Sequence, residues 1–71
     1  MNPNTRRYQT LVVSDQTIIR DVIVTDTHLV DGKLNGYCRL DGMSTVTWLV
    51  RQVDPEASTS VWMIIGWVRM R

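Results

Sequence analysis

A chain of 71 residues is long enough for one small domain, and a domain of this size buries only about 60% of the surface that its unfolded form exposes. The composition, with 44% hydrophobic and 21% charged residues and a formal net charge of +1, argues against a disordered chain and against a polycationic tail. The single cysteine, Cys38, excludes an internal disulfide, so oligomerisation is the support that we expect for so small a core.

The sequence gives no sign of export or of membrane insertion. Residues 1–7 contain two arginines, but no apolar stretch long enough for a secretory signal follows them. The longest apolar run, residues 61–68, is far shorter than the roughly 20 residues that span a bilayer. We therefore expect a cytoplasmic protein without membrane contacts, folded as a single β-domain over residues 1–71 with a flexible N-terminus at residues 1–5.

The first two predicted strands form a hairpin. They cover residues 7–13 and 17–25, and the short polar residues 14–16 between them are typical of a turn. The alternation of apolar and polar residues breaks in the second strand, where Arg20 and Asp21 lie between two apolar residues and three further apolar residues. A β-bulge or a strong bend near Arg20 would restore the alternation.

Two Asp-Gly dipeptides mark the next two hairpins. Asp31-Gly32 and Asp41-Gly42 are typical of type I′ turns, which need a positive φ at both central positions. They precede strands predicted over residues 33–40 and 43–53. The second, third and fourth strands are therefore expected to form an antiparallel meander.

The last predicted strand covers residues 59–70 and is apolar on both faces. It follows Asp54-Pro55, where a capping residue and a proline predict a single helical turn. One face carries Val61, Met63, Ile65 and Trp67, and the other carries Trp62, Ile64, Val68 and Met70. Because continuous apolar strands are typical of sheets packed on both faces, and the chain is too short to supply a second layer, we expect a partner to cover one face.

These elements predict an all-β fold. It is expected to be a small five-stranded antiparallel meander, bent into an SH3-like or OB-like barrel or into a half-open sandwich. The sequence does not separate these architectures.

The register of the hairpin at Asp41-Gly42 decides which face Trp48 occupies. A two-residue turn places Leu34 opposite Leu49 and puts Trp48 on the face away from Cys38. A three-residue loop would shift the parity by one and bring Trp48 to the side of Leu34 and Cys38. A third alternative keeps the two-residue turn and covers Trp48 with the fifth strand or another subunit. Burial of the apolar side chains that share this face of the fourth predicted strand is favourable, so we expect Trp48 to be covered.

The first register would create an aromatic and basic surface. Such a surface is typical of small barrels that bind single-stranded nucleic acid, because bases stack on aromatic rings while cations follow the phosphates. The near-neutral charge balance counts against this function. The candidate residues are Tyr37, Arg39, Trp48, Lys33 and His28.

We find no catalytic, cofactor-binding or metal-binding motif. His28 is the only histidine, and the two-residue register points it away from Cys38, the one candidate nucleophile with which it could pair. The carboxylates are spread over separate turns, and the glycines do not form a phosphate-binding loop. An enzyme would therefore need a site assembled across a subunit interface.

The leading hypothesis is a non-enzymatic domain that acts through protein contacts and self-associates through its last strand. Trp62 and Trp67, five residues apart, are expected on opposite faces of that strand, one covered by this chain and the other by a neighbour. The expected partners are a second copy and another protein. The predicted interface consists of Trp62, Ile64, Trp67, Val68 and Met70.

Overall fold

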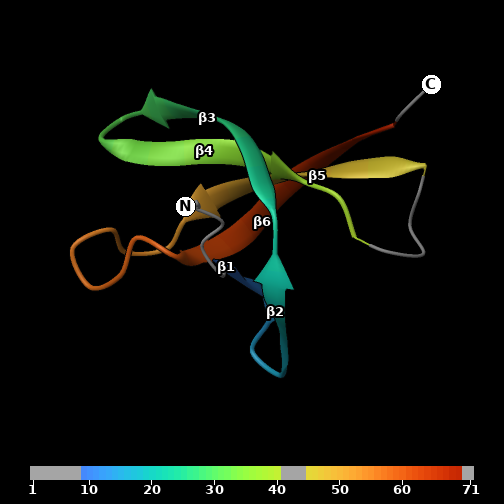
Figure 1. Cartoon of the computed structure of the whole chain (residues 1–71), viewed down its shortest axis with the longest axis horizontal. Helices are drawn as coiled ribbons and strands as arrows, with labels where there is room; N and C mark the ends of the chain where they lie inside the picture. The colour runs from blue at the N-terminus through green and yellow to red at the C-terminus, as the bar shows by residue number, and fades with distance from the viewer. Residues whose placement is uncertain (1–8, 41–44, 70–71) are drawn as a thin grey trace, which may run out of the picture.

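The computed structural model describes residues 9–40 and 45–69, which form six strands joined by short connections (Figure 1). The strands are β1 (Gln9–Ser14), β2 (Thr17–Val22), β3 (Val24–Val30), β4 (Lys33–Cys38), β5 (Val46–Gln52) and β6 (Val61–Arg69). The all-β prediction is confirmed. The expected flexible residues 1–5 lie outside the described part of the chain, and that part holds no helix of the length and apolarity needed to cross a membrane.

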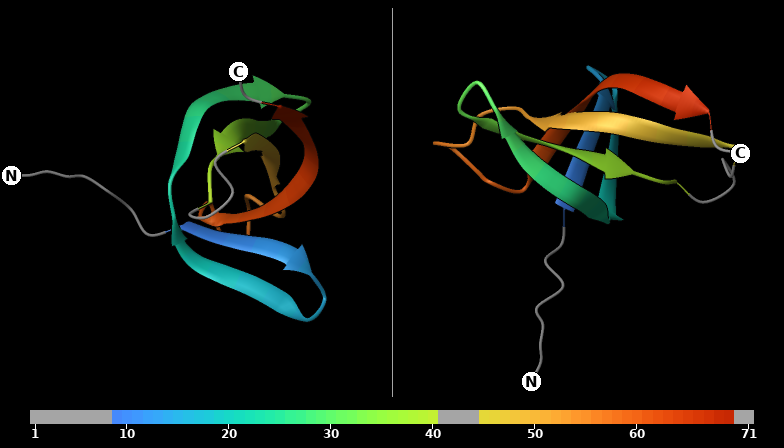
Figure 2. Two further views of the ribbon diagram at one scale, coloured as in Figure 1. Left: turned by 90° about the vertical axis from the view of Figure 1, so that its right-hand side faces the viewer. Right: turned by 90° about the horizontal axis from the view of Figure 1, so that it is seen from above.

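The strands form one curled sheet in the order β2-β1-β6-β5-β4-β3. Neighbouring strands are antiparallel, except that β1 and β6 run parallel. The sheet is mixed and is not closed into a barrel, and β2 and β3 form its two edges (Figure 2). The expectation of five purely antiparallel strands is therefore not confirmed, and neither is the barrel.

The sixth strand arises because the predicted second strand is bent into two. Gln9 pairs with Val22 while the next residue, Thr10, pairs with Arg20, so Asp21 is the extra residue of a β-bulge. Asp21 has a φ of 63°, a conformation that a short polar side chain tolerates. After Val22 the chain no longer pairs with β1. It passes Ile23 and continues as β3, which forms the opposite edge of the sheet. The bulge or bend predicted near Arg20 is confirmed.

The predicted turn at Asp31-Gly32 is also present. Val30 pairs with Lys33, and φ is 52° at Asp31 and 82° at Gly32, as a two-residue type I′ turn requires. The strands predicted around it form the antiparallel meander β3-β4-β5.

The register between β4 and β5 differs from the two-residue expectation. Cys38 lies opposite Trp48 and Tyr37 opposite Leu49, so the pairing of Leu34 with Leu49 is wrong. Directly opposed residues share a face, which places Trp48 on the side of Cys38. This is the side that the three-residue alternative gave, although the turn residues 41–44 themselves lie outside the described part of the chain.

The core lies on the concave side of the sheet. Five side chains from five strands are almost fully covered there, and Trp48 and Ile64 are among those packed around them. The five are Leu11, Val22, Cys38, Val50 and Trp62. One buried polar side chain, Gln52, joins the core to its surroundings by accepting a hydrogen bond from the Leu34 N–H at 2.9 Å and donating to the Thr59 carbonyl at 3.3 Å.

The connection between β5 and β6 forms the predicted single helical turn. The Ser58 N–H donates to the Asp54 carbonyl at 2.9 Å, and the Asp54 carboxylate accepts from the Glu56 N–H at 3.1 Å. This side-chain bond satisfies a backbone donor that the short turn leaves free.

Candidate functional site

The most prominent apolar surface of the domain lies on β6. Met63, Ile65, Trp67 and Val68 are between 43% and 55% exposed, although β6 is a central strand of the sheet. We call these four residues the β6 patch.

A second bulge explains how this surface arises. Val50 pairs with Ile64, whereas Leu49 pairs with Gly66, so Ile65 is the extra residue. Beyond the bulge Trp67 lies opposite Trp48, and Trp62 lies opposite Gln52. Since both of those partners belong to the core face of β5, Trp62 and Trp67 share one face, and the expectation that they lie on opposite faces is wrong.

The predicted interface residues therefore have different environments. Trp62 is 3% exposed and its indole N–H donates to the Gln9 side chain, so this residue belongs to the core and offers no surface to a partner. Ile64 packs against the core as well. Trp67 and Val68 are exposed, and Met70 lies outside the described residues. Met63 and Ile65 are the other two exposed residues. Because of the bulge, the alternation of side chains in the sequence could not show which residues of this strand are exposed.

One backbone edge of β6 is also free over part of its length. β1 pairs with β6 only from Val61 to Met63. Among the described residues, the part of β6 beyond Ile64 therefore has a strand, β5, on one side only. Three of the four patch residues, Ile65, Trp67 and Val68, lie on this part of the strand, whereas Met63 lies where β1 pairs with β6.

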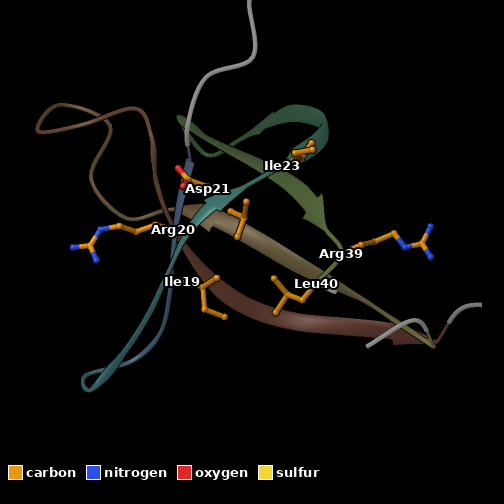
Figure 3. A pocket seen from close by; sticks show the side chains of 7 residues that line it. Ile19, Arg20, Asp21, Ile23, Arg39 and Leu40 are labelled. Carbon is orange, nitrogen blue, oxygen red and sulfur yellow. The ribbon is translucent and has the colours of Figure 1, made fainter. Parts of the chain in front are cut away.

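The aromatic and basic surface predicted from sequence is divided. Tyr37 faces the convex side with His28, whose ring centroid lies 6.4 Å from that of Tyr37. Trp48 lies on the concave side, so the structure does not bring it together with these rings. Lys33 donates to the Val53 carbonyl at 3.2 Å, and the Arg39 side chain extends away from the body of the sheet (Figure 3).

The reactive side chains are separated in the way the sequence predicted. Cys38 is 1% exposed on the core side, and burial raises the pKa of its thiol, which disfavours the thiolate nucleophile. His28 is exposed on the other side, with its Nδ1 3.1 Å from the Asp26 carbonyl oxygen. Within residues 9–40 and 45–69, no group of three or more metal-ligating side chains comes together.

A groove runs along β2, where the sheet fails to close. It consists of two adjoining pockets of about 480 and 340 Å³ that share Ile19 and Leu40. The larger pocket is apolar, and Trp48 and Ile64 contribute to its wall. The smaller pocket follows the backbone from Ile19 to Ile23 (Figure 3). We call this continuous hollow the β2 groove.

Sequence reasoning did not find the β2 groove. Its walls come from β2 and from Arg39-Leu40 after β4, and only the curl of the sheet brings these segments together. The broken alternation at Arg20 was the one signal in the sequence, because it marked the bend at which β2 and β3 separate.

The chain matches no protein-family model, and it shows no significant similarity to a curated protein or to a solved structure. The surfaces of the domain itself are therefore the basis for inferring its function.

Proposed function

We propose that this chain is a non-enzymatic β-domain that acts through protein contacts and self-associates through the C-terminal half of β6. The observation that carries the proposal is the β6 patch, whose four large apolar side chains are 43% to 55% exposed on a central strand. The patch occupies both faces of the strand, because Trp67 lies opposite Trp48 on the concave side whereas Met63 and Val68 lie opposite Arg51 and Thr47 on the other side. Large exposed apolar side chains gathered on one strand of a small protein commonly mark interaction sites.

Both the side chains and the backbone of β6 support pairing between two copies. Fully burying a large aliphatic side chain contributes about 1.5–3 kcal/mol, and tryptophan is enriched among the residues that dominate interface energies. In the part of the chain that the structure describes, no strand pairs with this edge of β6 beyond Ile64, and a second β6 could pair with its backbone groups in an antiparallel arrangement about a twofold axis. Such an assembly would also enlarge the small core of a chain of 71 residues.

Sedimentation velocity over a concentration series tests the proposal. The unmodified protein should dimerise reversibly, and Trp67→Arg should remain monomeric because a charge then occupies the centre of the contact. Leu29→Arg is the matched control, since Leu29 is 72% exposed but lies on the edge strand β3. A monomer throughout the series, or equal effects of the two substitutions, would contradict self-association through β6.

A further inference from the structure

Beyond self-association, we propose that the β2 groove binds an extended peptide segment of a protein partner as an added β-strand, with apolar residues at alternate positions and a carboxylate beside Arg20. None of the four β6-patch residues lines the groove, although Trp67 lies opposite Trp48 of its wall.

The free edge of β2 is the first element of this site. In the described part of the chain β2 pairs only with β1, which leaves its other edge without a neighbouring strand. Five consecutive residues of this segment, 19–23, line the smaller pocket. Before the bulge at Asp21, Ile19 and Arg20 point to opposite faces of the strand, so the fact that both line the pocket means that the backbone edge of β2 borders the groove there. An added strand could therefore pair with it, as in β-augmentation.

The apolar part of the groove is the second element. Thr17 and Ile19, two residues apart on the core side of β2, line the larger pocket together with Leu40 and Trp48. An added strand shares the pleat of β2, so its residues opposite Thr17 and Ile19 would enter this pocket. The indole N–H of Trp48 is buried without a hydrogen-bond partner among the described residues. A carbonyl or hydroxyl oxygen of the peptide could accept from it.

The charges around the groove select the peptide further. Arg20 and Arg39 extend to its two sides, and Asp21 is the only carboxylate among the described residues that line it (Figure 3). Arg20 alternates with Ile19, so although it borders the smaller pocket, it lies on the face of β2 away from the larger, apolar one. The peptide residue opposite Arg20 therefore stays in solvent, and a glutamate or aspartate there would form a cross-strand ion pair. The preferred segment thus alternates apolar residues with polar ones and carries acidic flanks.

The length of the groove sets the size of the segment. β2 has six residues, which correspond to about 20 Å of extended chain. A peptide of five or six residues would match the length of β2 on the side where Arg39 and Leu40 line the smaller pocket.

The probe is the synthetic peptide acetyl-Glu-Val-Thr-Val-Glu-amide, titrated into the isotopically labelled Trp67→Arg variant so that self-association does not interfere. We expect saturable NMR shifts of the backbone amides of residues 17–22 and of the Trp48 indole. The same peptide with N-methyl groups at alternate residues should not bind, because it lacks the backbone donors. Equal binding of both peptides, no saturable shift, or shifts confined to residues 63–68 would overturn the proposal.

Charge variants test the predicted ion pairs. Arg20→Glu should weaken binding of the acidic peptide about two- to fivefold and favour a peptide with lysine in place of glutamate. Arg69→Glu makes the same charge change at an exposed position on β6 and should leave the affinity unchanged. If both variants lose the same affinity for the peptide, the effect comes from net charge alone, and the proposed ion pair with Arg20 is wrong.

Amide hydrogen exchange identifies competing occupants. In the free protein, the amides of β2 that face the groove should exchange readily. Protection in the dilute monomer would mean that the chain itself fills the groove, and protection that increases with protein concentration would mean that a second copy does. Either result would overturn the assignment to a partner peptide.

Discussion

Replacing Gly36 by alanine tests the closest packing in the sheet. A Cβ atom built at Gly36 would lie 2.6 Å from Val24 Cγ1, which is 0.8 Å less than the 3.4 Å at which ordinary contact begins, and 3.1 Å from the Thr25 carbonyl oxygen. The side chain of Val24 could rotate, but the Thr25 oxygen belongs to the backbone of β3 and can move only with that strand. We therefore expect Gly36→Ala to separate β3 from β4.

The size of the effect follows from two opposing contributions. Overpacking costs about 1–3 kcal/mol, whereas removing a glycine from the unfolded chain returns about 0.4–1 kcal/mol. A net loss of about 1–2 kcal/mol is a large part of the roughly 4–11 kcal/mol expected for a domain of 71 residues. With a urea m value of about 1 kcal/mol/M, the unfolding midpoint should fall by about 1–2 M.

Gly66→Ala is the matched control. Its added Cβ would meet Leu49 Cδ1 at 3.4 Å and Leu49 Cβ at 4.0 Å, which are ordinary contacts. Its midpoint in equilibrium urea unfolding should stay close to that of the unmodified protein. If Gly36→Ala unfolds at the same urea concentration as Gly66→Ala, the close approach of β3 to β4 described here is incorrect.

Three further predictions concern the turn, the buried amide and the thiol. Gly32→Ala should lose about 1–2 kcal/mol in the same assay, because φ is 82° there and no atom lies within 4 Å of the new Cβ; an unchanged midpoint would argue against the left-handed turn. Gln52→Leu should cost about 1–3 kcal/mol, mainly because the part-buried Leu34 N–H loses its acceptor, whereas water can reach the carbonyl of the exposed Thr59; a neutral substitution would show that another group satisfies the N–H. Burial raises the pKa of Cys38, so the thiol of the unfolded chain loses its proton at a lower pH than the thiol of the folded chain. The free energy of unfolding should therefore fall as pH rises above roughly 8.5, and it should fall more steeply than in Cys38→Ala. Identical pH profiles of the two proteins, or fast thiol labelling of the folded chain, would contradict the burial of this residue.

Much of the local structure could be predicted from the sequence. The turn at Asp31-Gly32 and the break near Arg20 depend on residues that tolerate a positive φ, and this preference acts over two or three neighbouring residues. The capped turn at Asp54 has the same local character. The all-β class followed from β-branched runs between such turns, because side-chain sterics favour extended backbone in those runs.

The candidate site could be predicted only in part. The last strand was correctly singled out for its apolar residues, but the bulge at Ile65 changed which of them are exposed. One extra residue reverses the face of every side chain after it. Gly66 lies next to the extra residue, and a glycine inside a strand indicates a bend or bulge, but it does not indicate which residue is the extra one. The placement of Tyr37 relative to Trp48 was uncertain for the same reason. A shift of one residue in the hairpin register moves Trp48 to the other face, and several loop lengths are compatible with the sequence.

By itself, then, the sequence determined the strand-forming segments, their tight turns and the presence of an apolar last strand, since these follow from interactions between near neighbours. The tertiary structure alone decided the parallel pairing of β1 with β6, the burial of Trp62, the exposure of Trp67 and the position of the β2 groove. Each of these results from contacts between residues far apart in the chain, and such contacts depend on how the whole sheet curls. Among the described residues, β2 is one of the two edge strands and the C-terminal part of β6 carries exposed apolar side chains, and these are the two surfaces on which the proposed interactions rest.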